Sequence, residues 1–272
     1  MGAQRRYHHG WVPYDHGRTV GAPERIDVCG VPVDSVSMSD TVSTVLGWTA
    51  SEQPRVAVGI NANSAFLARG DARLAAQLRA ADLAYPDGQS VVWADRLLGG
   101  GCTERVATTD LVHPLTAALT ARGPARYFLL GGTPEVVRAA ARRLETEYPG
   151  LSTRVRDGYE GAADPRAVVE DVNDFAPDVL WVGMGDPRQQ QWVQQHRDEL
   201  RVGAVLTCGG LFDWLGGVHR RPPDWMVRAG LEWLWRLALE PRRLLRRYLL
   251  GNPWFVARLA RDKAAQLLGR RP

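Results

Sequence analysis

The chain has 272 residues, of which 45% are hydrophobic and 24% charged, a composition typical of a folded protein with a substantial core. No stretch approaches the roughly 18 consecutive apolar residues that a membrane-spanning helix requires. Residues 1–24 are rich in glycine, proline, histidine and arginine and have no apolar run. We therefore expect a flexible N-terminal extension, no secretory signal and a cytoplasmic protein.

The three cysteines are far apart in the sequence and odd in number. No Cys-x-x-Cys or Cys/His spacing occurs, so the sequence indicates neither a disulfide framework nor a structural zinc site. We expect Cys29, Cys102 and Cys208 to be small buried side chains in a reducing compartment, and we expect no metal site.

Between residues 25 and 220, short β-rich runs alternate with helical stretches. Strands are predicted at 26–33, 55–60, 82–85, 126–130, 153–156, 179–182 and 204–207. Helices are predicted at 71–80, 109–121, 134–148, 165–175 and 189–198. This alternation is typical of βαβ units, so residues 25–220 predict a Rossmann-like α/β core with a largely parallel sheet flanked by helices. Ligands of such sheets bind beyond the carboxyl ends of the strands.

The character of the chain changes near residue 220, after which no further strand is predicted. Residues 221–272 are interpreted as a helical appendage with helices at 224–239 and 241–268, interrupted near Pro241 and Pro253. Residues 220–272 hold 13 basic and 4 acidic side chains, a net charge of +9, whereas the remainder holds 21 basic and 26 acidic ones, a net charge of −5. A surface of the appendage therefore meets an anionic partner or is strongly solvated.

Two predicted strand ends run into glycine-rich turns. Gly131-Gly132 follows an apolar strand and precedes a helix, and Gly185 lies in a second turn that continues into Arg188 and Gln189. Glycine lets the backbone approach a ligand closely, and a helix N-terminus offers free N–H groups to a phosphate. Ordinary strand-to-helix turns have the same composition, so phosphate binding and a purely structural turn are both open.

Asp87 follows the predicted strand 82–85 and precedes Gly88, which places it at the carboxyl edge of the sheet. A carboxylate at that edge can deprotonate a hydroxyl nucleophile. The alternative is that Asp87 caps a helix that begins near Gln89. The spacing alone leaves both interpretations open.

Several segments together carry a resemblance to a known family. They are Asn61-Ala62-Asn63, Ala81-Asp82-Leu83 with Pro86-Asp87-Gly88, Glu104-Arg105-Val106 with Asp110-Leu111, Phe128 to Gly132, Pro177-Asp178, Gly183 to Gln189, Gly209 to Asp213, Arg221 to Trp225, and Gly230 to Arg236. In order and spacing this set resembles the WecG/TagA/CpsF family of bacterial glycosyltransferases over about residues 26–250.

The resemblance implies an inverting transfer of a sugar, of the N-acetylmannosamine type or a hexose, from a UDP-sugar to a polyprenyl-diphosphate-linked saccharide. It implies no metal and no other cofactor, and a place in the synthesis of a cell-surface polysaccharide or a teichoic-acid-type polymer. It also implies that Asp87 is the general base and that Gln189 binds substrate. Arg105 is given a catalytic role, because a fixed guanidinium stabilises the charge on departing UDP. The other candidate substrate-binding residues are Asn61, Asn63, Gly88, Gly131, Gly132, Gly185 and Asp213.

Three positions depart from the usual pattern of that family. Gly59 stands where the family often has threonine, so we expect one hydroxyl contact near Asp87 to be missing. Thr108 replaces a glycine, and Gln190 replaces a glutamate. These departures leave the base in place and put the identity of the donor sugar in doubt.

The basic appendage resembles the family's membrane-contacting element, which also closes the active site. Its candidate lipid-diphosphate and membrane residues are Arg236, Arg242, Arg243, Arg246 and Arg247. Arginines and tryptophans together favour an anionic membrane surface, so we expect a peripheral protein on the inner face of the cell membrane. The alternative is a helix at a homo-oligomer interface. No recognised nucleic-acid-binding motif accompanies the basic residues.

Two other functions compete with this interpretation. A dehydrogenase or another nucleotide-using α/β enzyme would need a glycine-rich G-x-G-x-x-G turn after its first strand, where this chain has Asn61-Ala62-Asn63. A non-catalytic, membrane-associated homologue that binds a UDP-sugar would explain Gly59 and Gln190 as decay. Turnover distinguishes the second alternative from an enzyme.

Overall fold

The structure is a computed structural model that describes residues 23–220, 222–223, 225–226 and 230–269. The flexible extension expected at 1–24 therefore lies almost wholly outside the described residues. The side chains of Arg243 and Arg246 lie outside them as well.

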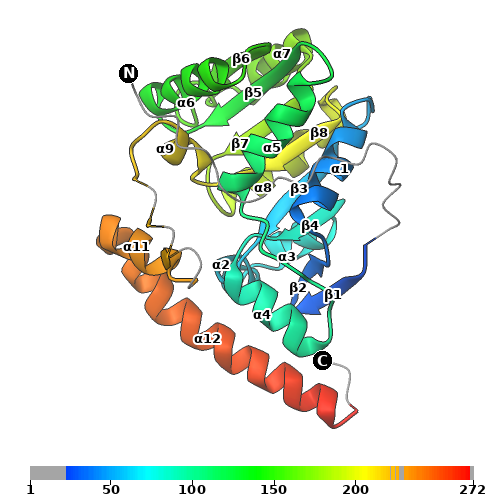
Figure 1. Cartoon of the computed structure of the whole chain (residues 1–272), viewed down its shortest axis with the longest axis vertical. Helices are drawn as coiled ribbons and strands as arrows, with labels where there is room; N and C mark the ends of the chain where they lie inside the picture. The colour runs from blue at the N-terminus through cyan, green and yellow to red at the C-terminus, as the bar shows by residue number, and fades with distance from the viewer. Residues whose placement is uncertain (1–22, 221, 224, 227–229, 270–272) are drawn as a thin grey trace.

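The core is a sheet of six parallel strands in the order β4-β3-β8-β7-β5-β6 (Figure 1). Its strands are β3 (Arg55–Ile60), β4 (Leu83–Pro86), β5 (Ala125–Gly131), β6 (Leu151–Arg156), β7 (Val179–Gly183) and β8 (Ala204–Thr207). The predicted Rossmann-like α/β fold with a parallel sheet is confirmed. All six carboxyl ends point to one edge of the sheet, where the candidate site lies.

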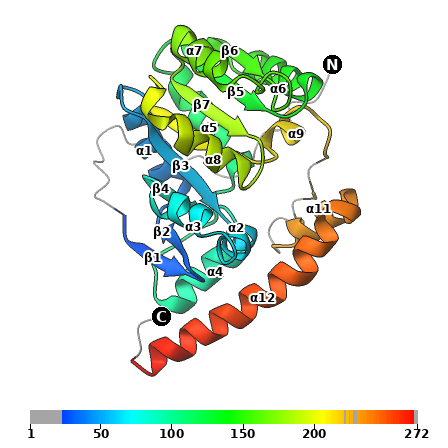
Figure 2. The same cartoon turned by 180° about the vertical axis from the view of Figure 1, so that it is seen from behind.

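Helices cover both faces of the sheet, as the opposite views in Figures 1 and 2 show. One hydrophobic cluster contains residues of α1 (Met38–Trp48), α5 (Thr108–Thr120), α6 (Pro134–Glu147) and α9 (Leu211–Leu215). The other contains residues of α2 (Ala62–Ala68), α3 (Ala72–Arg79), α4 (Gln89–Leu98), α7 (Pro165–Phe175) and α8 (Arg188–His196), which leads into the 3-10 turn η1 (Arg197–Glu199). The two clusters sandwich the sheet.

Strand β7 shows why the sheet forms from these residues. Leu180 and Val182 join one hydrophobic cluster, while Val179 and Trp181 join the other. Successive side chains of a strand point to opposite faces, so a run that is apolar throughout is stable where both faces are covered. This two-sided burial fixes the strand ends, and with them the loops that carry the candidate site.

The N-terminal part of the described chain is a hairpin, not the single strand predicted at 26–33. Strand β1 (Arg25–Val28) pairs antiparallel with β2 (Val31–Asp34). Cys29 and Gly30 connect them with positive φ angles of 56° and 93°, as a two-residue type I′ turn requires. The prediction is wrong because cysteine is not a typical residue at the first position of such a turn.

Helix α1 is absent from the predicted elements, although its start carries a sequence signal. The side chain of Ser37 accepts from the backbone of Asp40, and the Asp40 carboxylate accepts from the backbone of Ser37. This reciprocal capping box satisfies two N–H groups at the helix start. A search for serine followed three residues later by an acidic residue would have found it.

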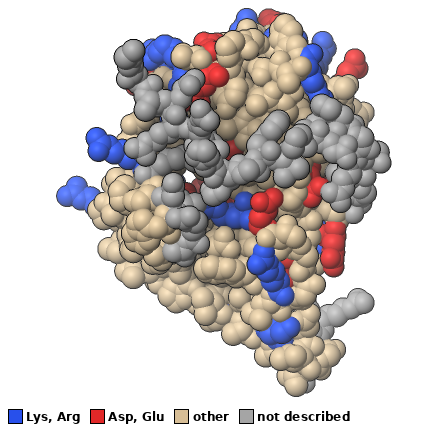
Figure 3. Space-filling model, viewed as in Figure 1, with Lys and Arg blue, Asp and Glu red and all other residues tan. Residues whose placement is uncertain are grey.

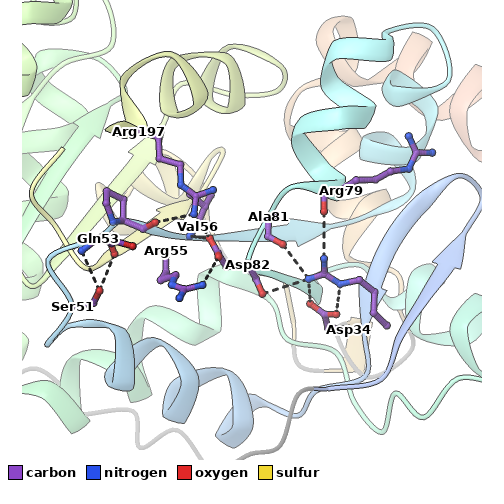
Figure 4. A network of polar contacts seen from close by, with 11 residues as sticks. Asp34, Ser51, Gln53, Arg55, Val56, Arg79, Ala81, Asp82 and Arg197 are labelled. Carbon is purple, nitrogen blue, oxygen red and sulfur yellow. Dashed lines mark hydrogen bonds and ion pairs between the residues drawn. The ribbon is translucent and has the colours of Figure 1, made fainter. Parts of the chain in front are cut away.

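The amino edge of the sheet is held together by ion pairs (Figure 4). Asp82 accepts from Arg55 at 2.9 Å and from Arg197 at 2.7 Å, and so ties the start of β3 to η1. Next to it, the buried Asp34 accepts two hydrogen bonds from Arg25, at 2.6 and 2.7 Å. These ion pairs lie at the edge of the sheet opposite the candidate site. They stabilise the fold and take no part in the candidate site.

After the core, the described residues include the helices α11 (Glu232–Leu239) and α12 (Pro241–Leu267). Of the predicted helix at 224–239, the structure shows residues 225–226 and α11 as helical, and Gly230, with a φ of 70°, lies in a turn before α11. Residues 224 and 227–229 lie outside the described residues. Helix α12 runs along α2 and α4 (Figures 1 and 2). None of the described helices combines the length and the apolar character needed to cross a membrane.

The predicted interruption at Pro241 is confirmed, but the one at Pro253 is wrong, since α12 continues through it. Proline removes one hydrogen bond from a helix interior. The ring of Pro253 is exposed, while Leu244 and Phe255 on either side of it are 1% and 3% exposed. Packing of both helix halves against the core therefore outweighs the lost bond.

All three cysteines are free and buried, as predicted. Burial is the main cause that raises the pKa of the thiols of Cys29 and Cys102 to about 12. Burial also raises the pKa of Cys208 well above its ordinary value. Buried thiols that stay protonated at neutral pH are poor nucleophiles, so these side chains serve packing.

Candidate active site

Asp87 lies at the carboxyl edge of the sheet, directly after β4. The backbone N–H groups of Asp87 and Gly88 both donate to the carbonyl of Ile60, at 2.9 and 3.1 Å. These bonds tie the turn after β4 to the end of the neighbouring strand β3. The carboxylate is therefore mounted on two paired strands of the rigid sheet, as its place in the sequence predicts.

The carboxylate of Asp87 does not cap the helix that follows it. Gly88 is the N-cap of α4, and that end has no side-chain cap. Instead, Oδ1 of Asp87 accepts from the backbone N–H of Thr108 at 2.8 Å and from its hydroxyl at 3.1 Å. The capping interpretation is wrong, because Asp87 is directed toward the start of α5 and away from its own helix.

Asn61 lies beside Asp87 at the end of β3, and Asn63 lies in the first turn of α2. The side-chain oxygen of Asn61 caps α2 by accepting from the backbone of Asn63 at 3.0 Å and of Ser64 at 3.2 Å. The cap directs the amide nitrogen of Asn61 toward Asp87, whose Oδ2 lies 3.5 Å away. A Cβ at Gly88 would lie 3.0 Å from the Cβ of Asn61, so glycine permits this close approach.

The expected loss of a hydroxyl contact at Asp87 is not observed. Thr108, one of the three departures from the family pattern, supplies a hydroxyl to the carboxylate. The same Oγ1 lies 2.8 Å from the hydroxyl of Tyr85, which is fully buried. Burial raises the pKa of Tyr85, and the negative charge of Asp87 raises it further. The prediction is wrong because position 59 was considered without its spatial neighbour at position 108.

Arg105 is directed into the same region from the loop before α5. Its side chain is 15% exposed, and its Nη1 lies 2.6 Å from Oε2 of Glu232, the first residue of α11. Asp110 lies 3.6 Å away on the same helix α5 that Thr108 begins. Burial lowers the pKa of Arg105, but Glu232, Asp87 and Asp110 together hold it above its ordinary value. The guanidinium is thus charged, and it joins the core to the appendage.

Gln189 is buried and holds two loops of the carboxyl edge together. Its amide nitrogen donates to Asp186 at 2.7 Å, and its amide oxygen accepts from the backbone of Gly209 at 3.0 Å. Gln190 also donates to Asp186, at 2.7 Å. These bonds give Gln189 and Gln190 a structural part in shaping the edge, whereas substrate binding by Gln189 stays a prediction.

The glycines at the other strand ends permit close backbone approach. A Cβ at Gly131 would lie 2.2 Å from the carbonyl oxygen of Gly183, and Gly132 donates its N–H to that same oxygen at 3.3 Å. The close approach of the neighbouring strand β7 therefore explains why glycine occupies these two positions. Gly185 has a φ of 77° and space around its Cα, so the turn after β7 leaves room for a ligand.

Asp213 and Arg236 both approach Gly210 in the turn after β8. A Cβ at Gly210 would lie 3.4 Å from Oδ2 of Asp213 and 3.5 Å from Nη2 of Arg236. Arg236 belongs to α11, and its Nε is buried with no hydrogen-bond partner among the described residues. A buried guanidinium nitrogen in that state is a donor for an anion. The structure thus brings an appendage arginine to the carboxyl edge of the core.

The remaining predicted basic residues lie on α12. Arg242 is exposed in its first turn, and the guanidinium of Arg247 lies 5.7 Å from the ring centre of Tyr248. The predictions for Arg243 and Arg246 concern side chains outside the described residues. Within the described ranges, no group of three or more His, Cys, Asp or Glu side chains could hold a metal ion. Metal independence itself stays a prediction.

Three residues of this region were missed as site residues. They are Tyr85, Thr108 and Glu232. Strand periodicity could have found Tyr85, because residues two apart on a strand share a face and Asp87 follows by two. Glu232 lies within the segment Gly230 to Arg236, but no local signal predicts its contact with Arg105, 127 positions away.

Comparison with known proteins shows which family the chain is related to. The sequence model of the glycosyl transferase WecG/TagA/CpsF family matches residues 26–268. Over 241 residues the chain is 27% identical to the N-acetylglucosaminyldiphosphoundecaprenol N-acetyl-beta-D-mannosaminyltransferase of Staphylococcus aureus strain NCTC 8325, an alignment that covers 88% of this chain and 93% of that protein. The protein of the same name from strain MRSA252 is 26% identical over 241 residues.

Proposed function

The chain belongs to the WecG/TagA/CpsF family of glycosyltransferases, and from that premise we propose that it moves a sugar from a UDP-sugar to a polyprenyl-diphosphate-linked saccharide. The Staphylococcus relatives are named for N-acetyl-beta-D-mannosaminyl transfer to N-acetylglucosaminyldiphosphoundecaprenol. A β-linked product formed from an α-linked nucleotide sugar requires inversion at the anomeric carbon. We infer a single displacement for this chain on that ground.

One observation carries the proposal: a carboxylate with an uncommitted oxygen lies near a partly buried, charged arginine. Asp87 is held through Oδ1, while Oδ2 has only the long Asn61 contact among the described residues. Arg105 is close enough for the charge of Asp87 to raise its pKa. A base and a cation so placed suit a reaction in which a hydroxyl loses a proton and an anion departs.

The step balances as follows. Oδ2 of Asp87 takes the proton of the acceptor hydroxyl, whose oxygen forms the bond to the anomeric carbon of the donor. The bond between that carbon and the diphosphate oxygen breaks, and its electron pair leaves with UDP. Arg105 and Arg236 stabilise the negative charge that develops on the diphosphate. The family's metal-independent chemistry is proposed on the strength of these two cations.

The exposed face of α12 supports peripheral membrane binding. Leu245, Leu249, Val256 and Leu267 are 47%, 63%, 65% and 75% exposed, and their spacing of four, seven and eleven residues places them on one helix face. The only acidic residue of α12, Asp262, is buried and paired with Arg258. The lower-left edge of the molecule in Figure 3, where α12 runs, is largely uncharged.

A helix that combines an exposed apolar face with many basic side chains has the composition of one that lies in a membrane interface. With 27 residues, α12 is about 40 Å long, enough to rest on a bilayer along its whole length. We therefore propose that this face holds the protein on an anionic membrane, where a polyprenyl-linked acceptor resides. The alternative is that a second copy of the chain covers this face in a homo-oligomer.

The activity test is UDP release by the full-length protein with a panel of UDP-sugars and a short-chain polyprenyl-diphosphate saccharide. We expect acceptor-dependent release with one donor, and a loss of roughly a hundredfold or more in Asp87→Asn with UDP binding retained. Asp71→Asn is the matched control, because Asp71 caps α3 through a side-chain oxygen that asparagine also has. Full activity in Asp87→Asn would show that Asp87 is not the general base. UDP-sugar binding by the unmodified protein without any turnover would favour the non-catalytic alternative.

The membrane test is sedimentation with vesicles of phosphatidylcholine and phosphatidylglycerol. We expect Leu249→Glu combined with Val256→Glu to reduce binding strongly, since charges enter the apolar face. Val218→Glu is the control, because Val218 is 55% exposed outside α12. Unchanged vesicle binding in the double variant, or a dimer in solution that the variant dissociates, would assign the face to another role.

A further inference from the structure

Thr108 stands at the centre of a short chain of hydrogen bonds that ends on Asp87. Its hydroxyl lies 3.1 Å from Oδ1 of Asp87 and 2.8 Å from the hydroxyl of the buried Tyr85. An ionised carboxylate only accepts, so Thr108 donates its one hydroxyl proton to Asp87. It must then accept from Tyr85, whose hydroxyl proton has that single partner among the described residues. The direction of the whole chain is therefore fixed from Tyr85 through Thr108 to Asp87.

The two oxygens of Asp87 are made unequal by this arrangement. Oδ1 receives both the N–H and the hydroxyl of Thr108, at 2.8 and 3.1 Å. Oδ2 has a contact of 3.5 Å with the amide nitrogen of Asn61, which is at the limit of a hydrogen bond. A partial rotation of the carboxylate would break both Thr108 bonds, and a half-turn only places the other, equivalent oxygen in the same position. Oδ2 is thus kept as the oxygen with lone pairs open to a substrate.

Gly59 provides the space in which Thr108 sits. A Cβ at position 59 would lie 3.0 Å from Oγ1 of Thr108, 3.0 Å from Cβ of Asp87 and 3.0 Å from Cε2 of Tyr85. Gly59 pairs with Tyr85 across the β3–β4 register, so the sheet itself holds these groups together. Any side chain at position 59 would press on the hydroxyl, the base and the tyrosine at once.

We propose that Thr108 is a positioning residue whose hydroxyl selects Oδ2 of Asp87 as the proton acceptor, and that Gly59 is the glycine that makes room for it. The proposal rests on the proposed function, in which Asp87 is the base. Thr108 touches no substrate in this role and acts through Asp87. Because it aligns a group that works in the chemical step, its loss affects turnover more than donor binding.

The test uses the full-length protein in the UDP-release assay, with kcat and KM measured separately. Thr108→Val keeps the backbone N–H and the side-chain shape but removes the hydroxyl, and kcat is expected to fall roughly ten- to a hundredfold. The donor KM should change by less than about threefold. Thr108→Ser restores a hydroxyl and should recover kcat to within about threefold of the unmodified protein.

A matched control separates positioning from stability. Thr116 lies on the same helix α5, is buried, and places its hydroxyl 3.1 Å from that of the buried Tyr127. Thr116→Val should therefore lower the melting temperature about as much as Thr108→Val while leaving kcat unchanged. Normal kcat in Thr108→Val, an equal loss in Thr108→Ser, or a loss confined to KM would each overturn the proposal.

Gly59 gives a second, independent measurement. Gly59→Ala should lower kcat, and it should cost less in a Thr108→Ala background, where one of the three close contacts is gone. Losses that simply multiply would show that Gly59 and Thr108 are unrelated. Asp87→Asn, measured alongside, distinguishes failure of the proposed function from failure of this inference. Full activity in Asp87→Asn would show that Asp87 is not the base. An inactive Asp87→Asn together with a normal kcat in Thr108→Val would refute the positioning role of Thr108 alone.

Discussion

Glu232 lies where an anionic leaving group is proposed to be stabilised, which makes the charge of Glu232 a sensitive probe of the site. Its carboxylate lies 2.6 Å from the guanidinium of Arg105, and the two side chains are 20% and 15% exposed. In the free protein the cation is therefore already balanced by an acidic residue of the appendage. A diphosphate that binds Arg105 meets repulsion from Glu232, so Glu232→Gln should strengthen UDP binding.

The magnitude follows from the geometry of the pair. A phosphate oxygen on the open side of Arg105 would lie about 6 Å from Glu232, where two unit charges repel by roughly 1.4–3 kcal/mol at effective dielectric constants of about 20–40. Both side chains are partly exposed, so we take the lower value of about 1.4 kcal/mol. That corresponds to a dissociation constant for UDP about tenfold lower. The glutamine oxygen still accepts from Arg105, so the appendage stays docked.

The assay is calorimetric titration of UDP into the wild type and Glu232→Gln at low salt and again at about 0.5 M NaCl, where screening shrinks the gain. Glu240→Gln is the control, since Glu240 is 19% exposed and lies 3.1 Å from Nε2 of His219, a contact distinct from that of Arg105. It should leave UDP binding unchanged. If Glu232→Gln binds UDP no better at either salt concentration, Arg105 does not stabilise the diphosphate in the way proposed.

Three further outcomes concern stability and reactivity. Gly131→Ala should destabilise the protein by at least about 3 kcal/mol in urea unfolding, because its Cβ would lie 2.2 Å from the carbonyl oxygen of Gly183 at a φ of 138°; a loss below about 1 kcal/mol would contradict the close approach. Asp34→Asn should cost about 2–3 kcal/mol in the same measurement, since a carboxylate that is 1% exposed loses its charge beside Arg25, itself partly exposed; unchanged stability would show that the ion pair contributes nothing. All three thiols should resist a disulfide reagent near pH 7, since they are buried and their pKa values are raised, to about 12 for Cys29 and Cys102; rapid labelling of the native protein would refute this, and unfolding in urea should expose all three.

Much of the fold could be predicted because its signals are local. Apolar runs alternating with amphipathic stretches predict a parallel sheet, and the strand ends of that sheet predict where Asp87 and the glycine turns lie. The errors also have local causes. The hairpin turn at Cys29 uses an uncommon residue, and Pro253 is tolerated because distant packing at Leu244 and Phe255 holds α12 straight.

The site itself was only partly predictable, because its contacts cross the sequence. Asp87 could be singled out from its place after a strand, but its partner Thr108 lies 21 positions away on another helix. The consequence of Gly59 was misjudged for the same reason. A glycine that looks like a lost hydroxyl in the sequence is, in space, the gap that another hydroxyl fills.

By itself, the sequence determined the class of fold, the edge of the sheet that carries chemistry, the carboxylate at that edge and the family to which the motifs point. These properties depend on residue type and short-range periodicity, which the order of the chain encodes directly. Only the tertiary structure decided that Asp87 turns away from its own helix, that Arg105 is paired across 127 positions with Glu232, and that Arg236 reaches the core. Those contacts exist because strand register and helix packing bring distant segments within a few ångströms of one another, and no local pattern specifies that distance.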